Sequence, residues 1–431
     1  MTAPTSLRLP LALMAGLLAG ACVDSSLPGD GGGGFPPPTG TPTIDVSPPE
    51  WTTLPGRSQV FTAIDPVSNQ PLVWTAPDEL FVLDVGSYAI TLGSGKPKGT
   101  FELHVASSVD PEVVGVAKIT VVPYGYSGTF ALVPGMAAAQ PQADVAATRG
   151  DAPAGERRVF LALYDPDAGT NSVGVWDAGF TTLLDSVSGL HFNPAQKPRV
   201  AADALGRVFW IEQWYDPSAA SRTRELVRRN VDGTLERFTW TPATTGGLQL
   251  VPGTDLACDD DGTLYFLAED GVSNLVVRFA DPFAAGALPE VVAPLAAAGP
   301  QVQLAVDAQG RLLVAVDAAL ERWTLPPGGA GVEVEALADL GASPTDLDAD
   351  ALGGVYALFA KRVDVLDDAG HVVGSLAKAS VGLPAKVPFE HLLGLGVDAQ
   401  GNLRLADDPL VDDPQLGPSS LRTYALDVQG P

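Results

Sequence analysis

The chain has 431 residues, which is enough for two or three domains, and 46% of them are hydrophobic. This composition supplies buried cores, so it excludes a chain that is disordered over most of its length. The formal net charge is −26. A surface this acidic repels phosphate groups, so we expect no nucleic-acid partner and no basic patch that binds anionic lipid.

The first segment has the features of an export signal. Arg8 precedes an apolar run, Leu9–Leu18, that is too short to span a bilayer comfortably. The small residues Ala19–Ala21 then lead directly to Cys22. This order resembles the bacterial lipobox, although Ala19 stands where leucine is usual. The resemblance implies a lipoprotein signal peptide over 1–21 and lipid on Cys22. An ordinary secretory signal with a chance cysteine is the alternative.

A segment of low complexity follows the cysteine. Residues 22–41 include Gly31–Gly34 and Pro36–Pro38, which cannot bury a core and predict a flexible tether. Val23 stands where the lipoproteins retained in the inner membrane of enteric bacteria carry Asp. The resemblance therefore implies a lipid-anchored protein of the cell envelope, at the outer membrane, whose membrane partner is reached through the anchor.

Residues 42–123 contain short runs with the alternation of β-strands, and Phe61 and Trp74 are the expected core anchors. Several such strands in a segment of this length predict a small β-sandwich. The landmarks resemble those of bacterial Ig-like domains: Val46-Ser47-Pro48, then Gly56, Phe61-Thr62-Ala63 and Trp74, then Gly99-Thr100-Phe101, Ala106-Ser107, Asp110-Pro111 and Thr120-Val121. The resemblance implies a spacer, with an adhesion module as the alternative.

The rest of the chain, 124–431, is organised by a repeat in which an apolar run, Asp-x-x-Gly and a second apolar run follow one another. A degenerate copy, Val145–Thr148 followed by Val159–Leu161, precedes five intact ones, and successive copies lie 43 to 56 residues apart. The intact copies carry these pairs: Asp203 and Gly206, Asp259 and Gly262, Asp307 and Gly310, Asp350 and Gly353, Asp398 and Gly401.

The spacing within the repeat predicts a β-hairpin. Asp favours the first position of a type I turn, and a Gly three residues later can adopt a left-handed conformation. Two hairpins per repeat make a four-stranded sheet, and six such sheets around an axis make a β-propeller. The pattern resembles NHL-type six-bladed propellers. The predicted fold is therefore all-β, a small Ig-like β-sandwich followed by a six-bladed β-propeller; a β-solenoid or a larger sandwich is the alternative for 124–431.

The last repeat is incomplete, because fewer residues follow Asp398 than separate any two repeats. An incomplete sheet exposes unpaired edges. We expect the strand Gly128–Val133 to complete it by pairing with strands near Leu421–Val428.

The sequence offers no catalytic constellation. The repeat aspartates are explained by turns, the four histidines form no close metal-binding pair, and no nucleophile elbow or phosphate loop is present. We expect solvated loops at Asp259–Asp261, Asp407–Asp408 and Asp412–Asp413, with Ca²⁺ binding as the alternative, and otherwise no cofactor or metal.

These features favour a membrane-anchored scaffold whose propeller binds an unknown protein or glycan. One alternative is a propeller hydrolase of the lactonase type, since the gluconolactonase-like propellers hold a divalent metal in the central channel. In that case several acidic or amide side chains should converge there. A purely structural envelope protein is a third possibility.

Overall fold

The computed structural model describes residues 43–53, 57–66, 70–77, 80–94, 99–121, 124–126, 131–132, 142–149, 157–165, 170–193, 196–216, 221–295, 302–325, 331–377, 389, 391–399, 401–408 and 421–428. The regular elements in these ranges are all β-strands, so the predicted all-β class is confirmed for the described residues. None of these residues belongs to a helix long and apolar enough to cross a membrane. Cys22 and the predicted signal peptide and tether lie outside the described residues.

The strands between residues 46 and 121 are β1 (Val46–Ser47), β2 (Glu50–Thr53), β3 (Ser58–Ala63), β4 (Leu72–Thr75), β5 (Phe81–Val85), β6 (Ala89–Gly93), β7 (Gly99–Ser107) and β8 (Val114–Val121). They form two four-stranded sheets, β1-β3-β6-β5 and β2-β8-β7-β4. Alternate residues of β8 are buried, and Ile119 packs with Phe61 of the other sheet in one apolar cluster. Phe61 is fully buried, as expected, whereas Trp74 packs against the cluster while partly exposed.

The described residues from 142 to 377 supply five further sheets, each made of strands that are consecutive in the sequence. The first two sheets contain β11 (Gln142–Ala147), β12 (Val159–Asp165), β13 (Thr170–Trp176) and β14 (Leu183–Ser188), then β15 (Val200–Ala202), β16 (Val208–Asp216), β17 (Ser221–Arg229) and β18 (Leu235–Thr239). The third contains β19 (Gln249–Leu250), β20 (Leu256–Cys258), β21 (Leu264–Glu269), β22 (Asn274–Phe279) and β23 (Glu290–Leu295). The fourth and fifth contain β24 (Val302–Val306), β25 (Leu312–Val316), β26 (Ala319–Thr324) and β27 (Glu333–Asp339), then β28 (Asp346–Ala349), β29 (Val355–Phe359), β30 (Arg362–Leu366) and β31 (Val372–Ala377).

A sixth sheet joins the two ends of this region. Its strands are β9 (Tyr124–Tyr126), β10 (Ala131–Leu132), β32 (Leu392–Val397), β33 (Leu403–Asp407) and β34 (Arg422–Val428). β10 pairs antiparallel with β34 through Ala131 and Thr423, and β9 pairs with the far end of the same strand. The pairing predicted from the sequence is therefore confirmed for Ala131 and Leu132; the neighbouring residues of that segment lie outside the described ranges.

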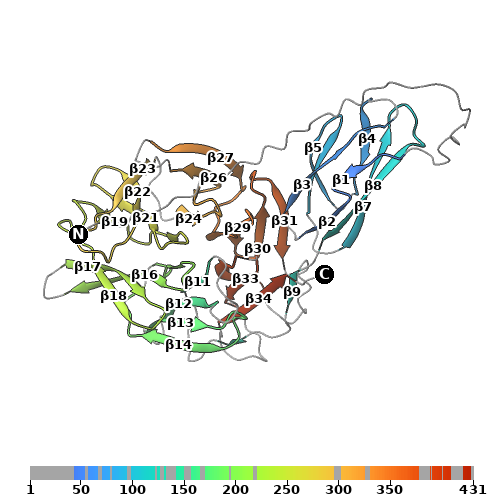
Figure 1. The fold of residues 1–431 in the computed structure, drawn as a ribbon. Coiled ribbons are helices and arrows are strands. Elements are labelled where there is room, and N and C mark those ends of the chain that lie inside the picture. The colour runs from blue at the N-terminus through green and yellow to red at the C-terminus, as the bar shows by residue number, and fades with distance from the viewer. Residues whose placement is uncertain are drawn as a thin grey trace, which may run out of the picture. The chain divides into compact units, whose positions relative to one another are not determined.

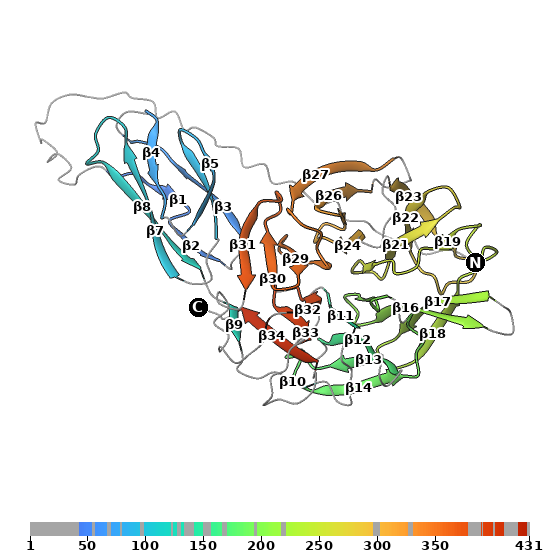
Figure 2. The same cartoon turned by 180° about the vertical axis from the view of Figure 1, so that it is seen from behind.

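The six sheets surround a common centre in a propeller-like arrangement (Figures 1 and 2). We call β11, β15, β20, β24, β28 and β32 the inner strands. Each inner strand contacts those of the sheets before and after it, and β32 contacts β11. A separate cluster of buried apolar side chains lies between each pair of neighbouring sheets. The clusters stabilise the ring, because each sheet removes apolar area of both its neighbours from water.

Two glycines allow the sixth sheet to approach the first. A Cβ atom on Gly394 of β32 would lie 2.8 Å from the main-chain nitrogen of Val145, and one on Gly396 would lie 3.0 Å from Ala146 C. Both contacts are with the main chain of β11, which has no room to move aside. Any larger residue at these positions would separate the two inner strands.

We predict that β9 and β10 are needed to complete the sixth sheet. A truncated chain that begins at residue 141 should be less stable than one that begins at residue 124, by at least about 2 kcal/mol, because several main-chain hydrogen bonds to β34 are lost. It should also associate, because the edge of β34 is then unpaired. Thermal unfolding and light scattering measure both effects. Equal stability of the two truncated chains would show that the closure contributes nothing.

Candidate functional site

The five Asp–Gly pairs predicted from the sequence all lie in the turn after an inner strand. The glycine N–H donates to the main-chain carbonyl of its aspartate, at N···O distances of 2.9 to 3.4 Å. Each glycine has a φ between 74° and 92°, which only glycine adopts without strain. The carboxylates accept main-chain N–H groups of the same turn; Asp203, for example, accepts from Leu205 and Arg207. These aspartates hold turns, and the cavity between the inner strands is lined by other residues.

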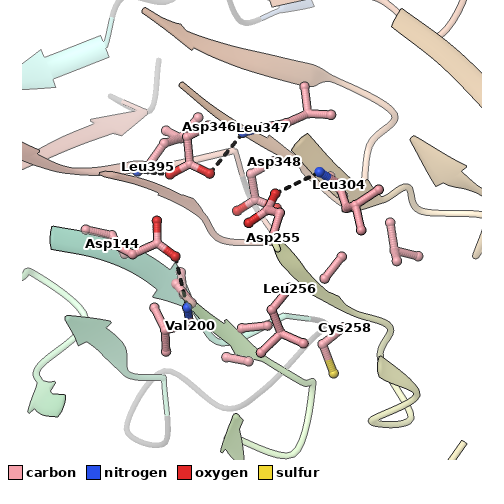
Figure 3. Close-up of a pocket in the computed structure, with 18 of the residues that line it drawn as sticks. Asp144, Val200, Asp255, Leu256, Cys258, Leu304, Asp346, Leu347, Asp348 and Leu395 are labelled. Carbon is pink, nitrogen blue, oxygen red and sulfur yellow. Dashed lines mark hydrogen bonds between the residues drawn. The ribbon is translucent and has the colours of Figure 1, made fainter. Parts of the chain in front are cut away.

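The inner strands enclose a small polar cavity with a volume of about 40 Å³ (Figure 3). Side chains alternate along a strand, so the position four residues before each turn residue lies on the same face as the turn residue. In chain order these positions hold Asp144, Arg199, Asp255, Gln303, Asp346 and Gly394. The aspartates come from the first, third and fifth sheets. We call Asp144, Asp255 and Asp346 the channel aspartates.

Each channel aspartate binds the main chain of the following sheet. Asp144 Oδ2 accepts the N–H of Val200 at 2.9 Å, and Asp255 Oδ2 accepts that of Leu304 at 2.7 Å. Asp346 Oδ2 accepts the N–H of Leu395 at 3.0 Å (Figure 3). The three carboxylates therefore join sheets one to two, three to four and five to six.

Two cations lie among the channel aspartates. Lys197 Nζ is 2.7 Å from Asp144 Oδ1 and 3.0 Å from Asp346 Oδ2. Arg199 Nη1 is 3.1 Å from Asp255 Oδ1 and 4.0 Å from Asp346 Oδ1. Arg199 and the three aspartates are all at least nine-tenths buried. Because these groups are buried away from water, each pairing is stronger than it would be on the surface.

The surroundings set the charge of each group. Burial opposes ionisation of Asp144, yet Lys197 and Arg199 hold its pKa below the usual value. Burial raises the pKa of Asp346 well above its usual range, with Lys197 opposing the rise and Asp144 adding to it. Arg199 is buried as well, but the three aspartates raise its pKa, so it stays charged. The cluster therefore resembles two salt bridges beside a third carboxyl that holds its proton more tightly.

The other end of the cavity is lined by Arg149. Its guanidinium donates to the carbonyl of Val306 and lies 3.5 Å from Asp348 and 3.3 Å from Asp260. Asp348 Oδ2 accepts the N–H of Val397 at 2.7 Å. Burial raises the pKa of Asp348 to about 6, although Arg149 and the main-chain donors oppose the rise.

The donor set does not fit a divalent cation. Every channel aspartate already accepts a main-chain N–H and lies beside Lys197 or Arg199, and the positive charge of these side chains repels a metal cation. No group of three or more His, Cys, Asp or Glu in the described residues has the arrangement of a metal site. A cavity of about 40 Å³ also admits a few water molecules rather than a sugar lactone.

The other residues that the sequence analysis considered as metal ligands, histidines and acidic groups, lie in separate parts of the described structure. His104 lies beside Glu102 on the exposed face of β7, and His371 lies beside Asp367 in a turn. Within the third acidic group, Asp412 and Asp413 lie outside the described residues. Asp260 and Asp261 are exposed, as expected for a solvated loop.

The expectation of a solvated loop is wrong for Asp407 and Asp408, which are buried at the end of β33. Burial and the neighbouring Asp407 raise the pKa of Asp408 to about 6. Cys258, the free cysteine of the described residues, is buried in β20, and burial raises the pKa of its thiol. A thiol of this kind packs as a small apolar group and is a poor nucleophile.

A second hollow, lined by both polar and apolar residues, lies beside Lys197 and Arg199. Its volume is about 30 Å³, and Asn193, Gln196 and Gln213 are among its lining residues. On the same side of the ring, the rings of His191 and Trp214 lie 5.1 Å apart. Neither of these features was recognised in the sequence, because only the meeting of the loop before β15 with β16 brings them together.

No family model matches the chain, and no curated protein is significantly similar to it. Among solved structures, a gluconolactonase-like protein is 15% identical, with 71% of this chain and 95% of that chain covered and a TM-score of 0.44. A gluconolactonase from Xanthomonas campestris is 14% identical, with 84% and 98% covered and a TM-score of 0.41. A fungal alcohol oxidase in complex with copper is 12% identical, with 71% and 75% covered and a TM-score of 0.36. Sequence identities and TM-scores this low carry no argument about activity, so the chemistry of this chain has to be inferred from its own residues.

We predict that Asp348 makes stability depend on pH. Its pKa is raised to about 6 from 3.8, so between these values the folded chain binds the proton more tightly than the unfolded chain. As the pH rises through this window, Asp348 therefore reduces the free energy of unfolding, by up to about 3 kcal/mol. Asp348→Asn should lack this loss. Denaturant unfolding of both chains from about pH 4 to pH 7 measures the difference.

Asp260→Asn is the matched control, because Asp260 is an exposed partner of the same Arg149. If the difference between Asp348→Asn and the wild type is the same at every pH, Asp348 is not the titrating group.

Proposed function

We propose that this protein is a lipid-anchored lipoprotein of the cell envelope whose ring of sheets is a binding scaffold. The proposal has four parts along the chain: a signal peptide over 1–21, a lipidated Cys22 with a tether to residue 41, an Ig-like spacer over 42–123, and a six-bladed β-propeller over 124–431. The Asp-x-x-Gly repeats and the six sheets in chain order support the propeller. The two packed sheets of β1 to β8 support the spacer.

One observation carries the choice of binding over catalysis: the channel carboxylates are neutralised by Lys197 and Arg199 of the same chain. A lactonase of the metal-dependent kind needs free oxygen donors and room for its substrate at the centre of the ring. Here Lys197 and Arg199 already lie against the carboxylates, and the cavity is small. Ligand contacts are left to the loops around the ring, which is where scaffolds of this type present variable residues.

The side of the ring where the inner strands begin is the better candidate for the contact surface. The β16–β17 hairpin extends there, and the ring of its Trp214 lies against that of His191, tilted by 38°; the His191 side chain is 56% exposed. Glu212 fixes this region, because its carboxylate accepts the indole N–H of Trp210 and the main-chain N–H of His191. A rigid aromatic pair with polar neighbours is suited to a protein or glycan partner.

We predict no lactone hydrolysis above background. The purified chain, assayed with glucono-δ-lactone and with an aromatic lactone, should give the buffer rate with or without added Ca²⁺, because Lys197 and Arg199 already pair with the channel carboxylates. Turnover is followed as acid release at constant pH. Metal-dependent turnover that disappears in Asp144→Asn or Asp255→Asn would support the hydrolase instead.

We predict that Cys22 carries the membrane anchor. Cys22→Ser should move the protein from the membrane fraction to the soluble fraction, because the thiol that accepts the lipid is gone. Detergent partitioning and the mass of the N-terminal peptide measure the change. Cys258→Ser is the control and should leave partitioning unchanged. Membrane association that survives Cys22→Ser would contradict the lipoprotein assignment.

A further inference from the structure

The three channel aspartates converge on one small space from the first, third and fifth sheets. Each uses one oxygen to accept a main-chain N–H of the next sheet. In Asp144 and Asp255 the other oxygen, Oδ1, faces a cation of this chain. Three buried carboxylates around the same two side chains cannot all ionise unless positive charge lies among them.

Lys197 and Arg199 supply that charge from a single stretch of chain. They precede β15 by three residues and by one residue, so alternation directs both side chains toward the same face. Lys197 bridges Asp144 and Asp346, and Arg199 pairs with Asp255 and approaches Asp346. The two positive charges of Lys197 and Arg199 thus lie next to three carboxylates. A bound divalent cation would place the same total charge among oxygen donors.

Gln303 and Gly394 complete the set of equivalent positions without adding charge. Gly394 contributes no side chain between Asp144 and Asp346, and a Cβ atom there would meet the main chain at Asp144. Other acidic groups near the cavity belong to its far end, where Arg149 faces Asp348. The charge balance of the cluster therefore rests on Lys197 and Arg199.

We propose that Lys197 and Arg199 are tethered counter-ions that occupy the place of a divalent cation in the channel, so that removing both converts the channel into a cation site. The wild-type ring is held together without metal. The channel aspartates are the ligands that the altered chain would offer, with Asp346 contacting both cations in the wild type. The proposal concerns the channel alone and does not depend on what the outer loops bind.

The test uses the Lys197→Met, Arg199→Met double variant and CaCl₂ as the probe. In EDTA its unfolding midpoint should lie below that of the wild type, because three carboxylates face one another without a cation. Millimolar CaCl₂ should raise the midpoint by about 5 °C or more, by binding the folded state alone. Equilibrium dialysis should give one Ca²⁺ per chain, and addition of Asp346→Asn should weaken it at least about tenfold.

Lys118→Met with Arg278→Met is the matched control, because it removes the same two charges from residues outside the channel. It should show no response to CaCl₂ beyond that of the wild type. The wild-type midpoint should itself be the same in EDTA and in CaCl₂.

Three results would overturn the proposal. One is a folded double variant that ignores CaCl₂, and another is a double variant that stays unfolded at every CaCl₂ concentration, since a divalent cation then cannot replace the two side chains. The third is a wild-type chain whose unfolding midpoint rises in CaCl₂, when the midpoint of the Asp346→Asn variant does not. None of these results bears on binding by the outer loops.

Discussion

The hydrogen bonds between β34 and the two strands β9 and β10 connect the ends of the region that forms the ring. Five sheets are built from consecutive strands and form through local hairpins. The sixth needs residues from both ends of the region, so the contact between β32 and β11 depends on pairing that no single stretch of chain supplies. The apolar cluster between these sheets, with Leu161 and Ala406, is buried only after that pairing.

The channel follows from the same arrangement. Inner strands that meet side by side bring one position of every repeat to the centre, and the chain fills these positions with acidic groups on alternate sheets. The aspartates join neighbouring sheets through main-chain N–H groups, and Lys197 and Arg199 offset their charge. A buried group of charges contributes little net stability, but breaking it is costly, so it favours one register of the strands over others.

Much of the fold could be predicted from the sequence, because its signals are local. The Asp-x-x-Gly turns depend on residues such as Asp307 and Gly310 that lie three positions apart, and their conformation is set by glycine. The closing strand could be predicted because an incomplete sheet must find a partner. The channel cluster could not, since Asp144, Asp255 and Lys197 are far apart in the sequence. The sequence does show that every second repeat carries Asp four positions before its turn residue. This pattern indicates a cluster only once the strands are known to form a ring.

The same reasoning explains why Asp407 and Asp408 were misjudged. Two adjacent aspartates at the end of a strand indicate a solvated loop on average, whereas here both are covered. Trp214 and His191 were missed because no motif in the sequence surrounds either residue. Their rings meet only when the loop before β15 folds against β16.

Gly394 and Gly396 have a consequence for the order of folding. The first five sheets mature from local contacts, whereas the seam between β32 and β11 is a contact between distant residues and is expected to form late. Because β32 presents glycines there, the two main chains approach closely, while Val145 and Leu393 of the same strands pack in the apolar cluster between the sheets. We therefore expect this seam to be the last contact of the ring to form, and a growing chain keeps it open until β34 has been synthesised, because β34 completes the sheet that contains β32.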